Sequence, residues 1–222
     1  MAWRSSGTTN ASLIDNLSAN GLITSERVKN AMKAVDRAHY APSFPYQDSP
    51  QTIGHRATIS APHMHANAAE SLLAYLNPGA KVLDVGSGSG YLTHVLAELI
   101  QPHGIVVGID HIQPLVDMAI ANTSTSGEGK ELLQKGVIRY VKGDGRKGWK
   151  EEGPYDAIHV GAAAEGHQQE LIEQLKAPGR LFIPVEEGEG QNIWVVEKDD
   201  KGEVRKRKEY GVRYVPLTDA PA

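Results

Sequence analysis

The feature that most constrains the fold is an alternation of short apolar strand patterns with amphipathic helix patterns between residues 81 and 185. Strands are expected over residues 81–85, 105–109, 137–141, 155–160 and 180–185, and helices over 91–100, 112–122 and 168–175. Strands separated by helices pair in parallel through right-handed crossovers, so we expect a mainly parallel sheet with helices on both faces. In such sheets ligands bind beyond the carboxyl ends of the strands.

The segments on either side of this region have patterns of their own. Helices are expected around residues 13–17 and from Ser25 onward, where Val28, Met32 and Val35 share one face. Residues 42–52 are rich in Pro, Ser and Gln, which indicates an extended loop. Residues 193–197 and 204–212 read as a hairpin around the turn at 199–202.

Composition excludes several classes of function. The 222 residues include no cysteine, so disulfides, thiolate metal sites and cysteine nucleophiles are ruled out. The net charge of −4 gives no general attraction to nucleic acid or anionic membranes, and we expect neither as a partner. The basic run 205–208 lies between Glu203 and Glu209 and is typical of a solvated edge strand. With no signal-peptide core or apolar run of membrane-spanning length, we expect a cytoplasmic protein, by default a monomer.

A glycine-rich loop follows the first expected strand. Gly86, Gly88 and Gly90 separate this strand from a helix, which is the context of a nucleotide-binding loop. Proteins that bind NAD, FAD or S-adenosylmethionine all use such loops. Asp84 precedes the loop and would repel a pyrophosphate, whereas S-adenosylmethionine has no phosphate and carries a cationic amine and sulfonium. We therefore expect Asp84 to face the cofactor; the alternative is that it only orders the N–H groups of the loop.

Acidic residues also end the next two strands. Asp110 lies about 20 residues beyond the glycine loop, the offset at which an acid accepts hydrogen bonds from ribose hydroxyls. Capping of the following helix is compatible with the same residue. After the third strand, Asp144 could accept the exocyclic amine of adenine while Gly145 allows the ring to approach. Together the three acids favour S-adenosylmethionine as cofactor, with no metal.

A second group of polar residues precedes the first strand. Ser60, His63 and His65 lie close together in sequence just before an expected helix. A hydrolase is poorly supported because no nucleophile-elbow motif surrounds Ser60, and a His-x-His pair lacks the further ligands of a zinc site. From the residues alone, capping of the helix by Ser60 and a catalytic role remain about equally possible.

Several strings resemble the protein-L-isoaspartate (D-aspartate) O-methyltransferase family. They are residues 58–65 (TISAPHMH), 80–90 (AKVLDVGSGSG), 108–111 (GIDH), 143–146 (GDGR), 154–164 (PYDAIHVGAAA) and 214–219 (YVPLTD). Matching segments run from Trp3 to Asp219, and the first and fifth strings are more specific than the glycine loop. The resemblance implies a Rossmann-like class I methyltransferase with a seven-stranded sheet and extra N-terminal helices. It also implies methyl transfer to the free carboxyl of L-isoaspartyl and D-aspartyl residues in damaged proteins, which return to aspartate through a succinimide.

The resemblance further implies roles for individual residues. Ser60 matches the active-site serine. The expected cofactor-binding residues are Ala57, Thr58, Ile59, His65, Asp84, Val85, Gly86, Ser87, Gly88, Asp110, His111, Leu115, Asp144, Gly145 and Thr218. The expected walls of the substrate cleft are Ala61, Pro62, Val215, Pro216 and Leu217.

One methyltransferase domain is expected over residues 1–222. It divides into N-terminal helices with the active-site loop (1–78), a cofactor-binding core (79–185), and a C-terminal hairpin with a substrate-cleft strand (186–222). Residues 176–180 (KAPGR) depart from the family's usual KPGGR, so we expect a changed turn before the fifth strand. The alternatives are methylation of a small-molecule carboxylate or of RNA, or cofactor binding without turnover. The acidic balance and the absence of an amine-methylation motif at the fourth strand disfavour RNA.

Overall fold

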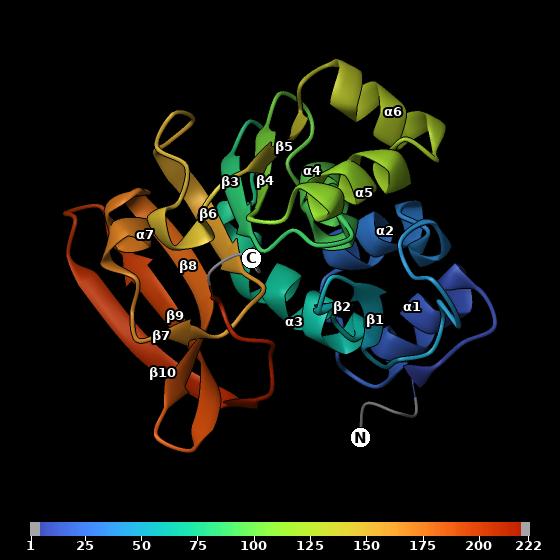
Figure 1. Ribbon diagram of the computed structural model, residues 1–222, viewed down its shortest axis with the longest axis horizontal. Coiled ribbons are helices and arrows are strands. Elements are labelled where there is room, and N and C mark those ends of the chain that lie inside the picture. Colours follow the sequence, from blue (N-terminus) through green and yellow to red (C-terminus); the bar gives the residue numbers. More distant parts are fainter. Residues whose placement is uncertain (1–4, 219–222) are drawn as a thin grey trace.

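The computed structural model describes residues 5–218, and its centre is one twisted sheet (Figure 1). Seven strands follow the order β10-β9-β8-β6-β3-β4-β5, and the short β7 pairs with β8 as an eighth strand. Pairing is parallel from β8 to β5, whereas β9 is antiparallel to both of its neighbours. The strands of this sheet are β3 (Lys81–Val85), β4 (Ile105–Asp110), β5 (Ile138–Lys142), β6 (Tyr155–Val160), β7 (Ala164–Glu165), β8 (Leu175–Glu187), β9 (Gly190–Lys198) and β10 (Val204–Val212). The predicted mainly parallel sheet is confirmed.

Two hydrophobic cores lie on opposite faces of this sheet because side chains alternate along each strand. In β3, Val82 belongs to one core and Leu83 to the other. The first core is covered by six helices and the second by α7. The helices are α1 (Asn10–Ala19), α2 (Glu26–Ala34), α3 (Pro62–Leu72), α4 (Tyr91–Leu99), α5 (Gln113–Thr123), α6 (Gly127–Gln134) and α7 (Gln169–Glu173). Short 3₁₀ helices are η2 (Arg37–His39), η3 (Leu73–Tyr75) and η4 (Gly145–Lys147).

The N-terminal helices form a layer outside α4, at the opposite end of the molecule from the β9–β10 hairpin (Figure 1). Leu13, Ile14 and Leu17 of α1 are buried, as their helical spacing predicts. Ser25 caps α2 by accepting a hydrogen bond from the Arg27 N–H, and Val28 and Met32 are buried. Both predicted N-terminal helices are thus confirmed.

Three local elements differ from the sequence expectations. Helix α6 and the small hairpin of β1 (Gln51–Gly54) with β2 (Ala57–Ile59) were not predicted. The hairpin reverses within 54–57, where Gly54, His55 and Arg56 all have positive φ angles. Strand β8 starts five residues earlier than expected, so the segment 176–180 is not a turn before a strand. It is an irregularity within β8, because Leu175 pairs with Tyr155 but the next partner along β6, Ala157, pairs with Arg180.

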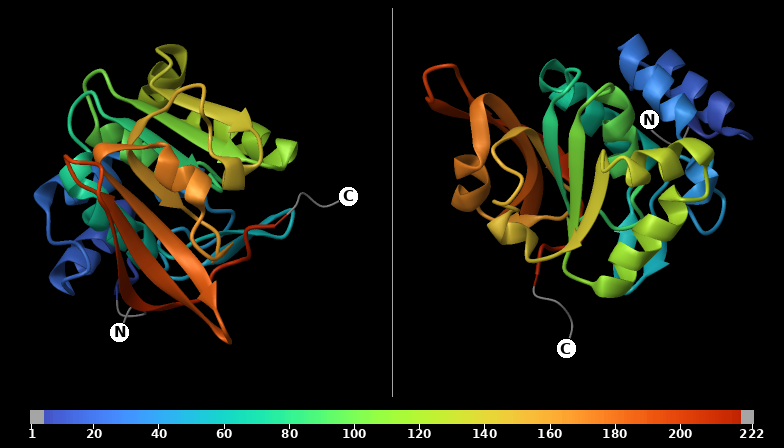
Figure 2. Two further views of the ribbon diagram at one scale, coloured as in Figure 1. Left: turned by 90° about the vertical axis from the view of Figure 1, so that its left-hand side faces the viewer. Right: turned by 90° about the horizontal axis from the view of Figure 1, so that it is seen from above.

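The C-terminal hairpin is confirmed, with β10 at the exposed edge of the sheet (Figure 2). The basic run 205–208 lies on β10 and is solvent-exposed, as expected of an edge strand. Lys208 pairs with Glu187, and Arg207 pairs with Glu209. Across residues 5–218, none of the helices has the length and apolar character needed to cross a membrane.

Candidate active site

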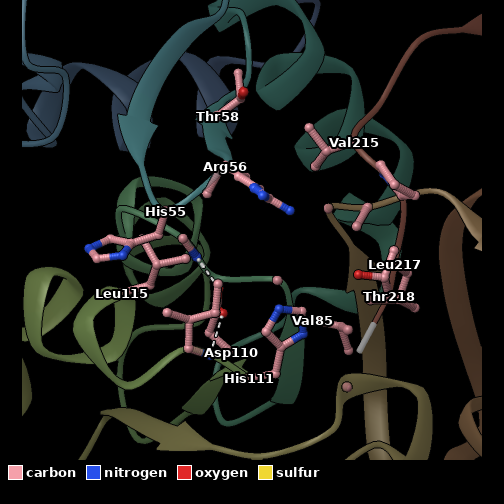
Figure 3. Close-up of a pocket in the computed structure, with 18 of the residues that line it drawn as sticks. His55, Arg56, Thr58, Val85, Asp110, His111, Leu115, Val215, Leu217 and Thr218 are labelled. Carbon is pink, nitrogen blue, oxygen red and sulfur yellow. Dashed lines mark hydrogen bonds between the residues drawn. The ribbon is translucent and has the colours of Figure 1, made fainter. Parts of the chain in front are cut away.

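A cavity of about 360 Å³ lies at the carboxyl edge of the parallel strands, where the topology predicts a ligand. Its walls come from the β1–β2 hairpin, the ends of β3, β4 and β6, the start of α5 and the C-terminal segment (Figure 3). The predicted site residues that line it are Ala57, Thr58, Val85, Gly86, Gly88, Asp110, His111, Leu115, Gly145, Val215, Pro216, Leu217 and Thr218. Residues as distant in sequence as Ala57 and Thr218 thus share one cavity, which is within the size range of small-molecule sites.

Asp110 joins the glycine loop to the start of α5. Its carboxylate accepts hydrogen bonds from the N–H of Gly88 at 3.2 Å and the N–H of Ile112 at 3.1 Å (dashed in Figure 3). Burial raises the pKa of Asp110 above its usual value, and the two backbone donors oppose that shift. The residue therefore orders the glycine loop and lines the cavity. The N-cap of α5 is Ile112, and no side chain within residues 5–218 caps this helix, so the helix-capping role considered for Asp110 is not observed.

A second, smaller cavity of about 30 Å³ adjoins the first and is much more polar. Thr58, Gly86, Gly88 and Gly161 line both cavities. The remaining residues of the small cavity are Ile59, Ser60, His65, Asp84, Ser87, Ser89, Tyr91, Leu92 and His159. Ser60 is thus brought beside the glycine loop, although it lies before the first strand of the large sheet.

The Asp84 side chain is almost completely buried. It is 1% exposed, and both of its carboxylate oxygens have protein partners. Nδ1 of His159 lies 2.8 Å from Oδ1, and the hydroxyl of Thr93 donates to Oδ2 at 2.5 Å. Asp84 lines the small cavity from a position fixed by these two side chains.

Ser60 does not cap the helix that follows it. The N-cap of α3 is Ala61, no side chain among residues 5–218 caps this helix end, and Pro62 occupies its first turn. The capping alternative for Ser60 is therefore wrong. Its backbone carbonyl accepts a hydrogen bond of 2.8 Å from Nη2 of Arg37, and its side chain lines the small cavity.

Three predicted site residues are not brought into either cavity. Asp144 caps η4 and is held by Arg146, whose Nε and Nη2 donate to its two oxygens at 2.8 and 2.9 Å. This hydrogen bonding lowers the pKa of Asp144 below its usual value. Ala61 and Pro62 are buried at the start of α3 and line neither cavity, so their role in substrate binding stays a prediction.

Other lining residues were missed from the sequence. His55 and Arg56 come from the unpredicted hairpin turn, and no sequence signal placed them near Asp110. Gly161 and Ala162 directly follow β6, so the rule that ligands bind at carboxyl ends of strands could have found them. Ser89 and His159 of the small cavity lie within the strings that resemble the family, and Tyr91 directly follows one of them, but none of the three was assigned a role.

The C-terminal segment is fixed to the end of β6 by two backbone hydrogen bonds. The N–H of Ala163 donates to the carbonyl of Val215 at 2.8 Å, and the N–H of Leu217 donates to the carbonyl of Ala163 at 2.7 Å. Pro216 lies between them in an isolated parallel bridge with Ala163. The segment therefore forms a fixed wall of the large cavity, while Asp219 lies outside the described residues, as does Trp3.

The sheet order, the glycine loop after β3 and the acid at the end of β4 define a Rossmann-like class I methyltransferase fold. Residues 8–222 match the family profile described as protein-L-isoaspartate(D-aspartate) O-methyltransferase. The chain belongs to this family.

Individual relatives agree over nearly the whole chain. The protein-L-isoaspartate O-methyltransferase of Caenorhabditis elegans is 48% identical over 218 residues, covering 98% of this chain and 96% of that protein. Protein-L-isoaspartate O-methyltransferase 1 of Arabidopsis thaliana is 46% identical over 215 residues, covering 96% and 93%. A Plasmodium falciparum protein-L-isoaspartate O-methyltransferase, crystallised with S-adenosyl-L-homocysteine, matches with a TM-score of 0.88 and 34% identity, covering 96% of this chain and 99% of that one.

Proposed function

We propose that this chain transfers a methyl group from S-adenosylmethionine to the free carboxyl group of L-isoaspartyl and D-aspartyl residues in damaged proteins. The observation that carries the proposal is the position of Ser60, in a polar cavity that adjoins a larger cavity of nucleoside size. Membership of the isoaspartate family supports the substrate.

The two cavities suit the two ends of the cofactor. The large cavity offers the apolar side chains of Ile109, Ile112 and Leu115 for a base and the carboxylate of Asp110 for ribose hydroxyls. The small cavity offers polar groups for an amino-acid end. Among them, the buried hydroxyl of Ser87 has no hydrogen-bond partner within residues 5–218, which is unusual unless a ligand supplies one.

When bound, S-adenosylmethionine would supply an electrophilic methyl carbon that a carboxylate oxygen can attack in line with the carbon–sulfur bond, with S-adenosyl-L-homocysteine as the leaving group. A carboxylate is already anionic at neutral pH, so the chain need not provide a strong general base. Its residues instead align the acceptor and exclude water. In this proposal the hydroxyl of Ser60 donates a hydrogen bond to the acceptor carboxylate and orients it.

The substrate is held mainly through its backbone, because damage sites occur in varied sequences. The fixed wall at Val215–Pro216–Leu217 supports this role, since its position beside the cavity is set by Ala163. We assign all these elements to one domain. Its N-terminal helices and active-site loop span residues 1–78, its cofactor-binding core spans 79–185, and its C-terminal hairpin and substrate-cleft strand span 186–222. We also propose that the enzyme is a cytoplasmic monomer and that it acts on proteins and not on nucleic acid.

Methylation of an aged protein tests this function. A protein incubated to accumulate isoaspartate is expected to take up labelled methyl groups from S-adenosylmethionine, whereas the same protein freshly prepared takes up far fewer. Base treatment should release the label, because it is held as a methyl ester. Equal labelling of the aged and fresh protein would contradict the proposal.

Replacing Asp110 with asparagine is expected to weaken binding of S-adenosyl-L-homocysteine about tenfold or more, because a hydrogen bond to a charged group contributes about 1.5–3 kcal/mol. Isothermal titration calorimetry measures this directly. Asp117→Asn is the matched control, since Asp117 is an exposed residue of α5 that accepts a hydrogen bond from Gln113 and lines neither cavity. An affinity unchanged by Asp110→Asn would contradict a hydrogen bond between the Asp110 carboxylate and the ribose.

A further inference from the structure

Arg37 is a completely buried cation beside the small cavity. It is 0% exposed, and no carboxylate within residues 5–218 forms an ion pair with it. Its Nη2 donates to the carbonyl of Ser60 at 2.8 Å, and its Nη1 lies 3.4 Å from Nδ1 of His65. The guanidinium also lies 5.2 Å from the ring centroid of Tyr91. One side chain thus contacts three residues that line the small cavity.

The surrounding structure holds Arg37 firmly in this position. Its backbone N–H donates to Oδ1 of Asn10, whose amide group donates to the carbonyls of Met32 and Val35. Asp36 caps η2 by accepting from the N–H of Ala38. The N-terminal helices therefore carry Arg37 to the site, which gives this extra layer a function beyond packing.

A buried cation without an ionic partner is costly, so its retention calls for a reason other than stability. Burial lowers the pKa of Arg37 to about 10, so the guanidinium still carries its charge at neutral pH. Burial, followed by the charge of Arg37, holds the pKa of His65 well below its usual value. His65 is therefore a neutral imidazole, in which one nitrogen donates and the other accepts.

We propose that Arg37 is a positioning residue that fixes the tautomer of His65 and thereby turns Nε2–H of His65 into a hydrogen-bond donor to the small cavity. A guanidinium has donors only, so Nδ1 of His65 must accept from it. The proton of the neutral ring then resides on Nε2, at the opposite edge of the imidazole. His65 lines the small cavity, and Nε2 has no partner within the described chain.

The chemistry of this donor points to an anionic ligand group. Nε2–H recognises a carboxylate, and within the proposed function that group is the carboxylate at the amino-acid end of S-adenosylmethionine. Arg37 simultaneously fixes the backbone of Ser60 through Nη2. The same side chain thus sets the cofactor contact and the position of the residue that orients the acceptor.

The tautomer can be measured in the unaltered protein. Long-range ¹H–¹⁵N correlation spectra of protein with ¹⁵N-labelled histidine, assigned with a His65→Gln sample, are expected to show His65 as the neutral Nε2–H form. A His65 that is protonated, or that carries its proton on Nδ1, would overturn the proposal. This readout does not depend on catalysis or on the identity of the substrate.

Binding of two probes tests the role toward the ligand. S-adenosyl-L-homocysteine has the amino-acid carboxylate, and 5′-methylthioadenosine lacks it. Arg37→Gln is expected to weaken binding of the first about tenfold, equivalent to about 1.4 kcal/mol, and to leave the second unchanged. Arg27→Gln is the control, because Arg27 also donates to backbone carbonyls, those of Leu76 and Leu99, but lies outside both cavities. Equal weakening of both probes, or of neither, would overturn the proposal.

If Arg37→Gln fails to fold, two variants of His65 distinguish the roles of its Nδ1 and Nε2 atoms. A glutamine amide reaches the position of Nε2 and can donate there, whereas an asparagine amide reaches only the position of Nδ1. His65→Gln should therefore retain more affinity for S-adenosyl-L-homocysteine than His65→Asn, and equal affinities would contradict the assigned donor. Failure of the proposed function itself is distinguishable, because unaltered protein that binds S-adenosyl-L-homocysteine and shows the Nε2–H form of His65 but does not methylate isoaspartyl peptides would contradict the proposed function alone.

Discussion

Replacing Ser60 with alanine is expected to lower the rate of methyl transfer about 100-fold, the scale of loss when a reacting group is misplaced by about 1 Å. The reason is geometric. The Ser60 carbonyl is fixed by Arg37, and its side chain lines the small cavity that adjoins the glycine loop. Losing the hydroxyl removes the donor proposed to orient the acceptor carboxylate but leaves this backbone in place. Single-turnover kinetics with an isoaspartyl peptide measure the effect.

Binding of S-adenosyl-L-homocysteine is the internal control for this variant and should change much less than the rate. Ser124→Ala is the matched control variant, because Ser124 is an exposed C-cap residue of α5 whose hydroxyl donates to the carbonyl of Ile120 and which lines neither cavity. A normal transfer rate in Ser60→Ala would remove Ser60 from the mechanism. An affinity loss as large as the rate loss would show that Ser60 serves the cofactor and not the acceptor.

Replacing Gly90 with alanine is expected to reduce the free energy of unfolding by about 3 kcal/mol, combining a left-handed backbone with overpacking. Gly90 is the N-cap of α4 and has a φ of +88°. A Cβ here would lie 2.6 Å from the hydroxyl of Tyr140 and 3.1 Å from Cβ of Ala119. Tyr140 could withdraw only by losing its hydrogen bonds to Thr123 and to the Gly90 carbonyl. Urea denaturation measures the change.

Gly202→Ala separates the two contributions. Gly202 has a similar φ of +82° in the β9–β10 turn, but a Cβ there would meet no atom of the described residues within 4 Å. The Gly202→Ala variant should lose only the contribution of the left-handed backbone, about 1–2 kcal/mol of the free energy of unfolding. Adding Tyr140→Phe to Gly90→Ala should recover part of the additional loss, because the nearest clashing atom is removed. Equal losses in Gly90→Ala and Gly202→Ala would show that Tyr140 moves aside at no cost.

Much of the fold could be predicted because buried strands consist of short apolar runs that can be recognised in the sequence. The apolar residues of 81–85 predict β3, and the parallel topology predicts that the acids near the ends of β3 and β4 meet at one edge of the sheet. The structure places Asp84 and Asp110 at this edge. The neighbours of these acids were not predictable in the same way. Asp144 follows β5 as expected, but Arg146, two residues later, binds its carboxylate and holds it outside the cavity lining.

Arg37 shows what sequence patterns do not reveal. An arginine in a polar stretch between two helices indicates a surface residue, because burial of an unpaired cation is unfavourable. Only the tertiary contacts of η2 bring it against Ser60 and His65. The β1–β2 hairpin was missed for a related reason. Its strands are short, and its turn is made by His55 and Arg56, which rarely adopt positive φ angles.

The most direct measurement of the central claim is a methylation assay with paired synthetic peptides that differ only in an L-isoaspartyl or an L-aspartyl linkage at one position. With S-adenosylmethionine in excess, the isoaspartyl peptide is expected to form a methyl ester on its free α-carboxyl, and the aspartyl peptide is expected to remain unmodified. Esterification of both peptides at similar kcat/KM, or of neither, would contradict the assignment of this chain as an isoaspartyl methyltransferase.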